Sequence, residues 1–133
     1  MSPKSRRGIR GFTLIEMIIV ISMILVLLSI ALPFYNQSIR RAKEATFHHN
    51  LVTLNKAIGE FTLNKNKAPQ TLEELVPDYL KFIPDDITGS NTWVTEAEDF
   101  QDATDPNQPG IKSVHSASNE LSLEGKEYSS YTH

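Results

Sequence analysis

The hydrophobic pattern separates a continuous apolar segment near the N-terminus from a chain that is amphipathic beyond it. Between Phe12 and Leu32, Glu16 is the only charged residue. A helix over this range would be about 31 Å long, close to the hydrocarbon thickness of a bilayer. A core helix of a soluble domain is rarely apolar on every face over such a length. The pattern therefore predicts a membrane-spanning helix.

Beyond the span, apolar residues recur every three or four positions, which is typical of an amphipathic helix with one buried face. Pro33 predicts a kink or local unwinding, because proline removes an amide donor and clashes with the preceding turn. Gly59 should weaken the helix by about 0.5–1 kcal/mol relative to alanine, and we expect it to allow close packing there. The apolar stripe consists of Phe47, Leu51, Leu54, Ile58 and Phe61. The polar residues assigned to the opposite, solvent-facing side are Arg40, Arg41, Lys43, Glu44, Asn55, Lys56 and Glu60.

Shorter elements are expected after the helix ends near Asn64. Thr71 and Glu74 have the spacing of a capping box, which predicts a short helix through Val76. Residues 96–110 are acidic with few apolar positions and are expected to form a loop. Alternating residues between turn signals predict strands at 92–95, at 111–116 and, more weakly, at 121–123. The fold class is therefore α+β, a long N-terminal helix with a transmembrane half and an amphipathic half, packed on a small C-terminal antiparallel β-sheet.

The residues before the span are basic and include Lys4, Arg6, Arg7 and Arg10, with no acid. Basic residues before a first span hold that end in the cytoplasm, so the C-terminal part is expected outside. So short an arm beside a span is more often a topology signal than a nucleic-acid site. The formal charge is −3 and there is no cysteine. An external domain of this chain would therefore hold together without disulfides.

A cleavable secretory signal is the competing interpretation of this end, because Ser29-Ile30-Ala31 offers small residues where such a signal could be cut. The apolar region is longer than the roughly 7–15 residues usual in such signals, and it contains Glu16. The sequence therefore favours a retained span.

Glu16 needs an explanation, because a carboxylate inside a span costs about 3 kcal/mol on insertion scales. It could be a first-turn acid favoured by the helix dipole and reaching toward the headgroups. Alternatively, it could pair with a positive group once the span packs in a protein assembly. Glu16 lies four residues after Phe12 on the same helical face, so a cut before Phe12 would place a new α-amino group beside it. Both interpretations remain open from these residues alone.

The segment Ser5-Arg-Arg-Gly-Ile-Arg-Gly followed by Phe12-Thr-Leu-Ile-Glu resembles the class III signal of type IV pilins and type II secretion pseudopilins. The resemblance implies that a prepilin peptidase cuts between Gly11 and Phe12 and methylates the new Phe12 amine. It also implies that Glu16 recognises the N-terminal amine of a neighbouring subunit, and a proline near Pro33 is a common family feature. The expected domains are a leader at 1–11, a transmembrane and assembly helix at 12–33, and a periplasmic pilin-like domain at 34–133.

Downstream, Pro69-Gln-Thr-Leu-Glu-Glu-Leu and Tyr79-Leu-Lys-Phe-Ile-Pro-Asp-Asp resemble G-type major pseudopilins. The resemblance implies a structural subunit of a type II secretion pseudopilus in the bacterial inner membrane, single-pass, with a cytoplasmic N-terminus. The implied partners are other copies of the chain, prepilin peptidase, an inner-membrane assembly platform with minor pseudopilins, and membrane lipid. A type IV pilus pilin, a minor pseudopilin and a non-polymerising single-span protein with a binding domain remain alternatives.

Metal and catalytic sites are weakly indicated. G-type relatives usually bind calcium through clustered aspartates in a C-terminal loop, but the chain has no aspartate after Gly110. The acidic loop offers calcium-type oxygen ligands without the spacing of an EF-hand. Its candidates are Asp99, Asp102 and Asp105. No cofactor is assigned, and calcium is the one candidate metal. His48 and His49 point to different helix faces, and no phosphate loop or nucleophile–base pair is apparent, so we do not expect an enzyme.

Overall fold

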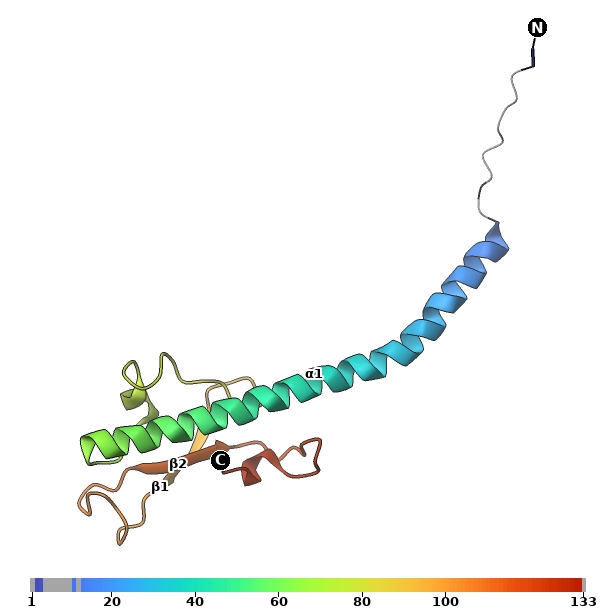
Figure 1. Cartoon of the computed structure of the whole chain (residues 1–133). Coiled ribbons are helices and arrows are strands. Elements are labelled where there is room, and N and C mark those ends of the chain that lie inside the picture. Colours follow the sequence, from blue (N-terminus) through green and yellow to red (C-terminus); the bar gives the residue numbers. More distant parts are fainter. Residues whose placement is uncertain (1, 4–10, 12, 133) are drawn as a thin grey trace. The chain divides into compact units, whose positions relative to one another are not determined.

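The computed structural model describes residues 2–3, 11 and 13–132. A long N-terminal helix and a small antiparallel sheet give the α+β arrangement that the sequence predicts (Figure 1). Contacts divide the chain into two compact units, Met1–Ile39 and Arg40–His133. The elements are α1 (Leu14–Lys65), the 3₁₀ helix η1 (Leu72–Leu75), the strands β1 (Trp93–Ala97) and β2 (Ile111–Ser116), and the 3₁₀ helix η2 (Tyr128–Ser130).

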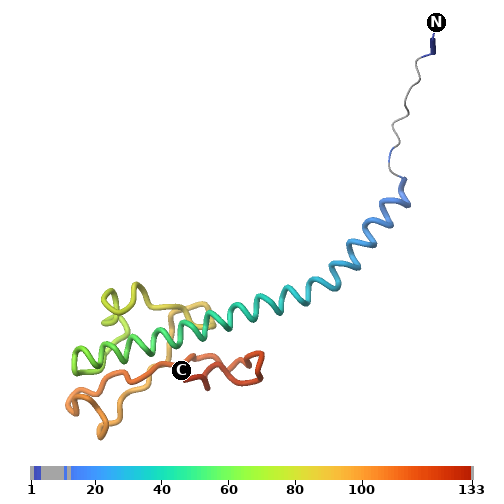
Figure 2. The backbone as a smooth tube through the Cα atoms, in the orientation of Figure 1, coloured from blue at the N-terminus to red at the C-terminus, as the bar shows by residue number. Residues whose placement is uncertain are grey.

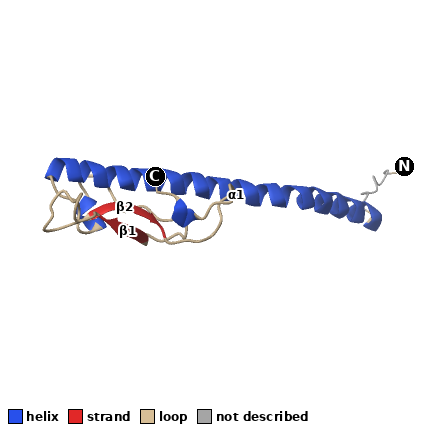
Figure 3. Ribbon diagram, turned by 90° about the horizontal axis from the view of Figure 1, so that it is seen from below, coloured by secondary structure: helices blue, strands red, loops and turns tan. Residues whose placement is uncertain are grey.

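The apolar stripe in the second half of α1 forms the core of the unit 40–133. The predicted stripe residues, Phe47 through Phe61, are all buried, and none is more than 5% exposed. The ring of Trp93 stacks on that of Phe47 with the ring centroids 6.1 Å apart. The chain after α1 turns back and stays beside this half of the helix, with β1 and β2 lying along it (Figures 2 and 3). The other main core residues are Leu72, Leu75, Leu80, Ile111, Val114 and Tyr128.

The two strands pair antiparallel, with Trp93 opposite Ser116 and Ala97 opposite Ile111, and a bulge interrupts the register near Glu96. β2 has the predicted bounds. β1 reaches Ala97, so its last two residues lie in the segment predicted as loop.

The third predicted strand, at residues 121–123, is not present. Leu121 forms one isolated antiparallel bridge with Glu127. The reason is local, because the Ser122 amide donates to the Lys126 carbonyl at 2.7 Å and closes a tight turn instead of extending the sheet.

The capping box predicted at Thr71 is also not present. The threonine side chain makes no cap hydrogen bond, and the element is a 3₁₀ helix that ends at Leu75. The Glu74 amide, which a threonine hydroxyl would cap, donates instead to the Thr71 carbonyl at 3.3 Å. This tighter turn uses the donor that the capping box would need.

Two glycines have different environments. A Cβ at Gly110 would lie 2.7 Å from the Ala68 Cβ and from the Pro69 carbonyl oxygen. That close approach allows the Ile111 amide to donate to the Pro69 carbonyl at 2.8 Å. A Cβ at Gly59 would meet nothing within 4 Å, so the prediction of close packing at this position is wrong.

Truncating Phe61 to alanine should destabilise the unit 40–133 by about 3–5 kcal/mol, because a buried aromatic ring leaves a cavity in the core. The measurement is denaturant unfolding of the full chain in detergent, followed by the fluorescence of Trp93, the single tryptophan. An unchanged midpoint would mean that the stripe packs on something other than this core.

Gly59→Ala is the matched control, two residues away on the exposed side of the same helix. It should raise stability by about 0.5–1 kcal/mol, because alanine loses less backbone entropy on helix formation. A loss of stability would contradict the open environment described for this position.

Candidate processing and assembly site

α1 begins with a reciprocal pair of hydrogen bonds between Thr13 and Glu16. The Thr13 amide donates to Glu16 Oε2 at 3.3 Å, and the Glu16 amide donates to Thr13 Oγ1 at 3.3 Å. This is a capping box, which satisfies backbone donors that have no partner inside the helix. The capping box was not predicted, although threonine followed three residues later by glutamate before an apolar run is its known signature.

The span within the unit 1–39 exposes its apolar side chains on every face. From Leu14 to Leu32 the large hydrophobic residues are 45–79% exposed. α1 is long and apolar enough to cross a membrane, with a mean hydropathy of 2.8 in its most apolar window. Ser22 donates to the Ile18 carbonyl at 2.7 Å and Ser29 to the Val26 carbonyl at 2.6 Å. These hydroxyls are satisfied within the helix, as a hydrocarbon environment requires.

The residues assigned to processing lie at the start of this unit. Gly11 is exposed, and a Cβ there would meet nothing within 4 Å. Internal packing therefore does not require a glycine at this position. Phe12 lies outside the described residues. Pro33 lies inside α1, and the residues on both sides of it are helical, so the predicted local unwinding is not observed.

The acidic loop uses its backbone and carboxylates in local turns. The Asp102 amide donates to the Asp99 carbonyl at 3.0 Å, and Asp105 Oδ1 accepts from the Asn107 amide at 2.9 Å. Among the residues that the structure describes, no three His, Cys, Asp or Glu side chains gather where they could hold a metal ion. Calcium binding by this loop stays a prediction without a supporting contact.

Two polar residues of β2, Ser113 and His115, contact one acid of β1. Ser113 Oγ donates to Glu96 Oε2 at 2.9 Å, and His115 Nε2 lies 3.6 Å from Glu96 Oε1. Both side chains therefore face the same carboxylate. The Ser113 hydroxyl donates to Glu96. A serine nucleophile would instead have to donate to the histidine that acts as its base.

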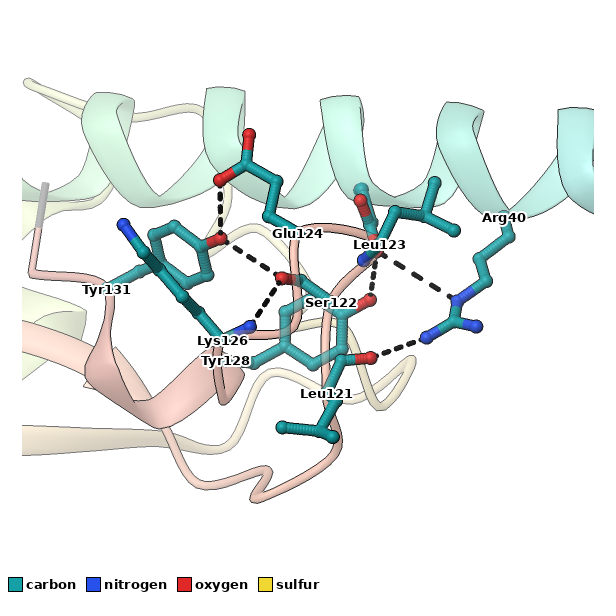
Figure 4. A network of polar contacts seen from close by, with 9 residues as sticks. Arg40, Leu121, Ser122, Leu123, Glu124, Lys126, Tyr128 and Tyr131 are labelled. Carbon is teal, nitrogen blue, oxygen red and sulfur yellow. Dashed lines mark hydrogen bonds and ion pairs between the residues drawn. The ribbon is translucent and has the colours of Figure 1, made fainter.

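Glu44 is the buried acid of the second half of α1, with 9% of its surface exposed. Its Oε1 atom accepts from the Leu123 amide at 2.7 Å and from the Tyr128 hydroxyl at 2.7 Å. Arg40 Nε lies 3.9 Å from the same oxygen, and its guanidinium also donates to the Leu121 carbonyl (Figure 4). We call this network of Arg40, Glu44 and residues 121–128 the C-terminal clasp.

The assignment of Glu44 and Asn55 to the solvent-facing side of the helix is wrong. Asn55 accepts from the Val114 amide at 2.8 Å and donates to the Thr132 carbonyl at 3.0 Å. Glu44 precedes the stripe residue Phe47 by three positions, and Asn55 follows Leu51 by four. This spacing places both on the buried face, and it is the signal that could have identified them.

The clasp changes the acidity of Tyr128. Burial raises the pKa of the Tyr128 hydroxyl, and the hydrogen bond and negative charge of Glu44 raise it further, while Arg40 acts in the opposite direction. Because the neutral phenol is the favoured form, it can donate to Glu44 throughout the neutral pH range.

Residues 6–32 match the family described as the prokaryotic N-terminal methylation motif. The match covers the three arginines before the span, Gly11, Phe12 and the apolar part of α1, and it supports a type IV pilin-like protein. Together with the long apolar helix, it fits a membrane-anchored, single-pass protein. No curated protein matches the chain, and no solved structure matches it.

The raised pKa of Tyr128 makes the stability of the clasp sensitive to alkaline pH. A group whose pKa is higher in the folded than in the unfolded chain stabilises the fold below its ordinary pKa of about 10 and loses that contribution as the pH rises through the folded pKa. Tyr128 should therefore ionise in a late step, above the ordinary tyrosine pKa of about 10, which ultraviolet titration of the phenolate can measure. Tyr128→Phe should remove the late step.

Glu44→Gln is the second variant in this experiment. It should lower the pKa of Tyr128 only in part, because burial, the larger cause, remains. A Tyr128 titration that is the same in Glu44→Gln and in the unchanged chain would contradict the contact described for the clasp.

Proposed function

We propose that this chain is a structural subunit of a type II secretion pseudopilus, polymerising through α1 to drive protein export. The observation that carries the proposal is the methylation motif at residues 6–32, because such a motif implies processing by a prepilin peptidase and assembly into a pilus-like filament. Peptide-bond hydrolysis between Gly11 and Phe12 would leave a new α-amino group on Phe12, and methylation of that amine would keep its positive charge. The anchored chain would have its N-terminus in the cytoplasm and its C-terminal domain in the periplasm.

The contacts of Glu16 support this role. Thr13 donates to Glu16 Oε2 through an amide that cleavage before Phe12 would leave intact. A carboxylate can accept about four hydrogen bonds, so the capping box leaves acceptor capacity for an amine. In a filament, where span helices pack together with little lipid, the amine of a neighbouring copy would pair with this carboxylate. Opposite charges attract more strongly there than in water, which can offset desolvation if the geometry is good.

The cysteine-free C-terminal segment supports the pseudopilin branch over pilins that close this region with a disulfide. In this chain the clasp residue Glu44 binds the segment through the Leu123 amide and the Tyr128 hydroxyl. The proposed role in type II secretion implies the assembly platform, minor pseudopilins and the secretion channel as partners.

Gly11→Leu should block leader cleavage while the chain still inserts in the membrane, because a leucine side chain would obstruct the backbone that the peptidase reads. Mass spectrometry of the N-terminus should find methylated Phe12 in the unchanged chain and an intact leader in the variant. Gly8→Leu, three residues upstream, is the matched control and should be processed. A mature, methylated N-terminus in Gly11→Leu would contradict the assigned cleavage site.

Two substitutions of Glu16 separate its capping role from its charge. Glu16→Gln keeps an oxygen that can accept from the Thr13 amide, since glutamine also serves in a capping box, but it removes the negative charge. Glu16→Leu removes both. If charge pairing holds the filament, both variants should be inserted and cleaved, and both should lose assembly and secretion.

Cross-linking between subunits in cells that overproduce the chain measures this assembly. A ladder of multimers in Glu16→Gln equal to that of the unchanged chain, with loss only in Glu16→Leu, would mean that Glu16 acts only as a helix cap. The proposed pairing with the Phe12 amine would then be wrong.

A further inference from the structure

Three basic residues lie within four positions where the second compact unit begins: Arg40, Arg41 and Lys43, which we call the basic collar. The side chain of Arg40 is 53% exposed, and Arg41 and Lys43 are exposed. The neighbouring acid, Glu44, is buried and binds the Leu123 amide and the Tyr128 hydroxyl. In the part of the chain that the structure describes, neither Arg41 nor Lys43 forms an ion pair. The collar is therefore a local positive charge on a chain whose formal charge is −3.

The collar residues point in different directions around α1. Successive residues of an α-helix are separated by about 100°, so Arg41 lies about 100° from Arg40, and Lys43 lies about 60° from Arg40 on its other side. A flat protein partner could meet Arg40 and Lys43 together, but Arg41 lies about 160° from Lys43 and would face away from it. A layer of lipid headgroups surrounds a helix that leaves a bilayer, and can reach all three.

The length of chain between the span and the collar limits their separation. Arg40 lies eight positions after Leu32, so even a fully extended chain could hold them no more than about 29 Å apart, and a helical rise gives about 12 Å. Headgroups extend about 5–8 Å beyond the hydrocarbon on each side, and the Debye length adds about 8 Å in physiological salt. The collar can therefore lie within the field of the membrane surface.

The residues directly after the span have the chemistry of a membrane interface. Phe34 is 66% exposed and Tyr35 is 63% exposed. Aromatic side chains are enriched at the headgroup level, where an apolar ring can remain close to lipid and a polar group can meet water. Asn36, Gln37 and Ser38 follow, and the apolar residue Ile39 lies between them and the collar. The order of apolar span, aromatic pair, polar residues and cations follows the layers of a bilayer surface.

We propose that the basic collar binds the anionic phosphate headgroups of phospholipids in the leaflet where the span ends. The occupant is the lipid surface, because it is the negatively charged partner that the span brings within reach of these residues in every orientation of the chain. Each exposed cation near an anionic surface is expected to raise the preference for acidic lipid by about fivefold. Lipid binding requires neither leader cleavage nor filament assembly. The lipid proposal can therefore be wrong while the proposed function is right, and the proposed function can be wrong while the lipid proposal is right.

The test uses the full chain reconstituted in phosphatidylcholine bilayers that contain spin-labelled phosphatidylglycerol or spin-labelled phosphatidylcholine. Electron spin resonance measures how strongly the protein prefers the acidic lipid. Arg41→Gln with Lys43→Gln should reduce this preference by about fivefold for each cation removed, which is about 25-fold in all. Lys65→Gln with Lys67→Gln removes the same charge from exposed residues at the other end of α1, and should leave the preference unchanged. The four basic residues of the leader are common to all variants.

Two results would overturn the proposal. One is an unchanged lipid preference in the collar variant, and the other is an equal loss in both variants, which would report net charge alone. If the collar variant lost cross-linking between copies while its lipid preference stayed the same, the partner would be another copy of the chain. Unchanged Trp93 fluorescence verifies that each variant is folded.

Discussion

α1 is one continuous α-helix whose two halves have different surroundings. Its first half is apolar on every face, and its second half buries one face in a core. In hydrocarbon, every backbone amide and carbonyl must be satisfied within the segment, which an α-helix achieves. Ser22 and Ser29 follow the same constraint by donating to carbonyls of their own helix. Beyond the span the helix has to bury only one face, and the stripe from Phe47 to Phe61 supplies it. The remaining elements of the unit 40–133 are organised on that stripe.

Two acids of α1 illustrate how a carboxylate can be accommodated without full hydration. Glu16 accepts a hydrogen bond locally, from the amide of Thr13 in the same turn. Glu44 is satisfied by the Leu123 amide and the Tyr128 hydroxyl, from a segment far along the chain. The first arrangement needs only the helix terminus, so it can persist whether the span is surrounded by lipid or by other helices. The second exists only when the C-terminal segment is folded.

Long-range polar contacts connect the C-terminal segment of the unit 40–133 to α1. Asn55 binds the Val114 amide in β2 and the Thr132 carbonyl near the C-terminus. Glu44 binds the turn that precedes η2. The hydrogen bonds to the Val114 and Leu123 amides are partly buried, whereas the one to the Thr132 carbonyl is exposed. Together they hold the C-terminal tail on the helix.

The sequence by itself determined the span, the amphipathic stripe and the bounds of β2, because each depends on periodicity within a few neighbouring residues. It also contained the Thr13–Glu16 cap in a local signature that could have been recognised. Only the tertiary structure decided which groups Glu44 binds, because its partners lie about eighty residues away in the chain. The same holds for Gly110, where the approach of Ala68 leaves no room for a side chain. Local patterns specify the elements, whereas burial and polar pairing depend on which distant segment the fold brings alongside.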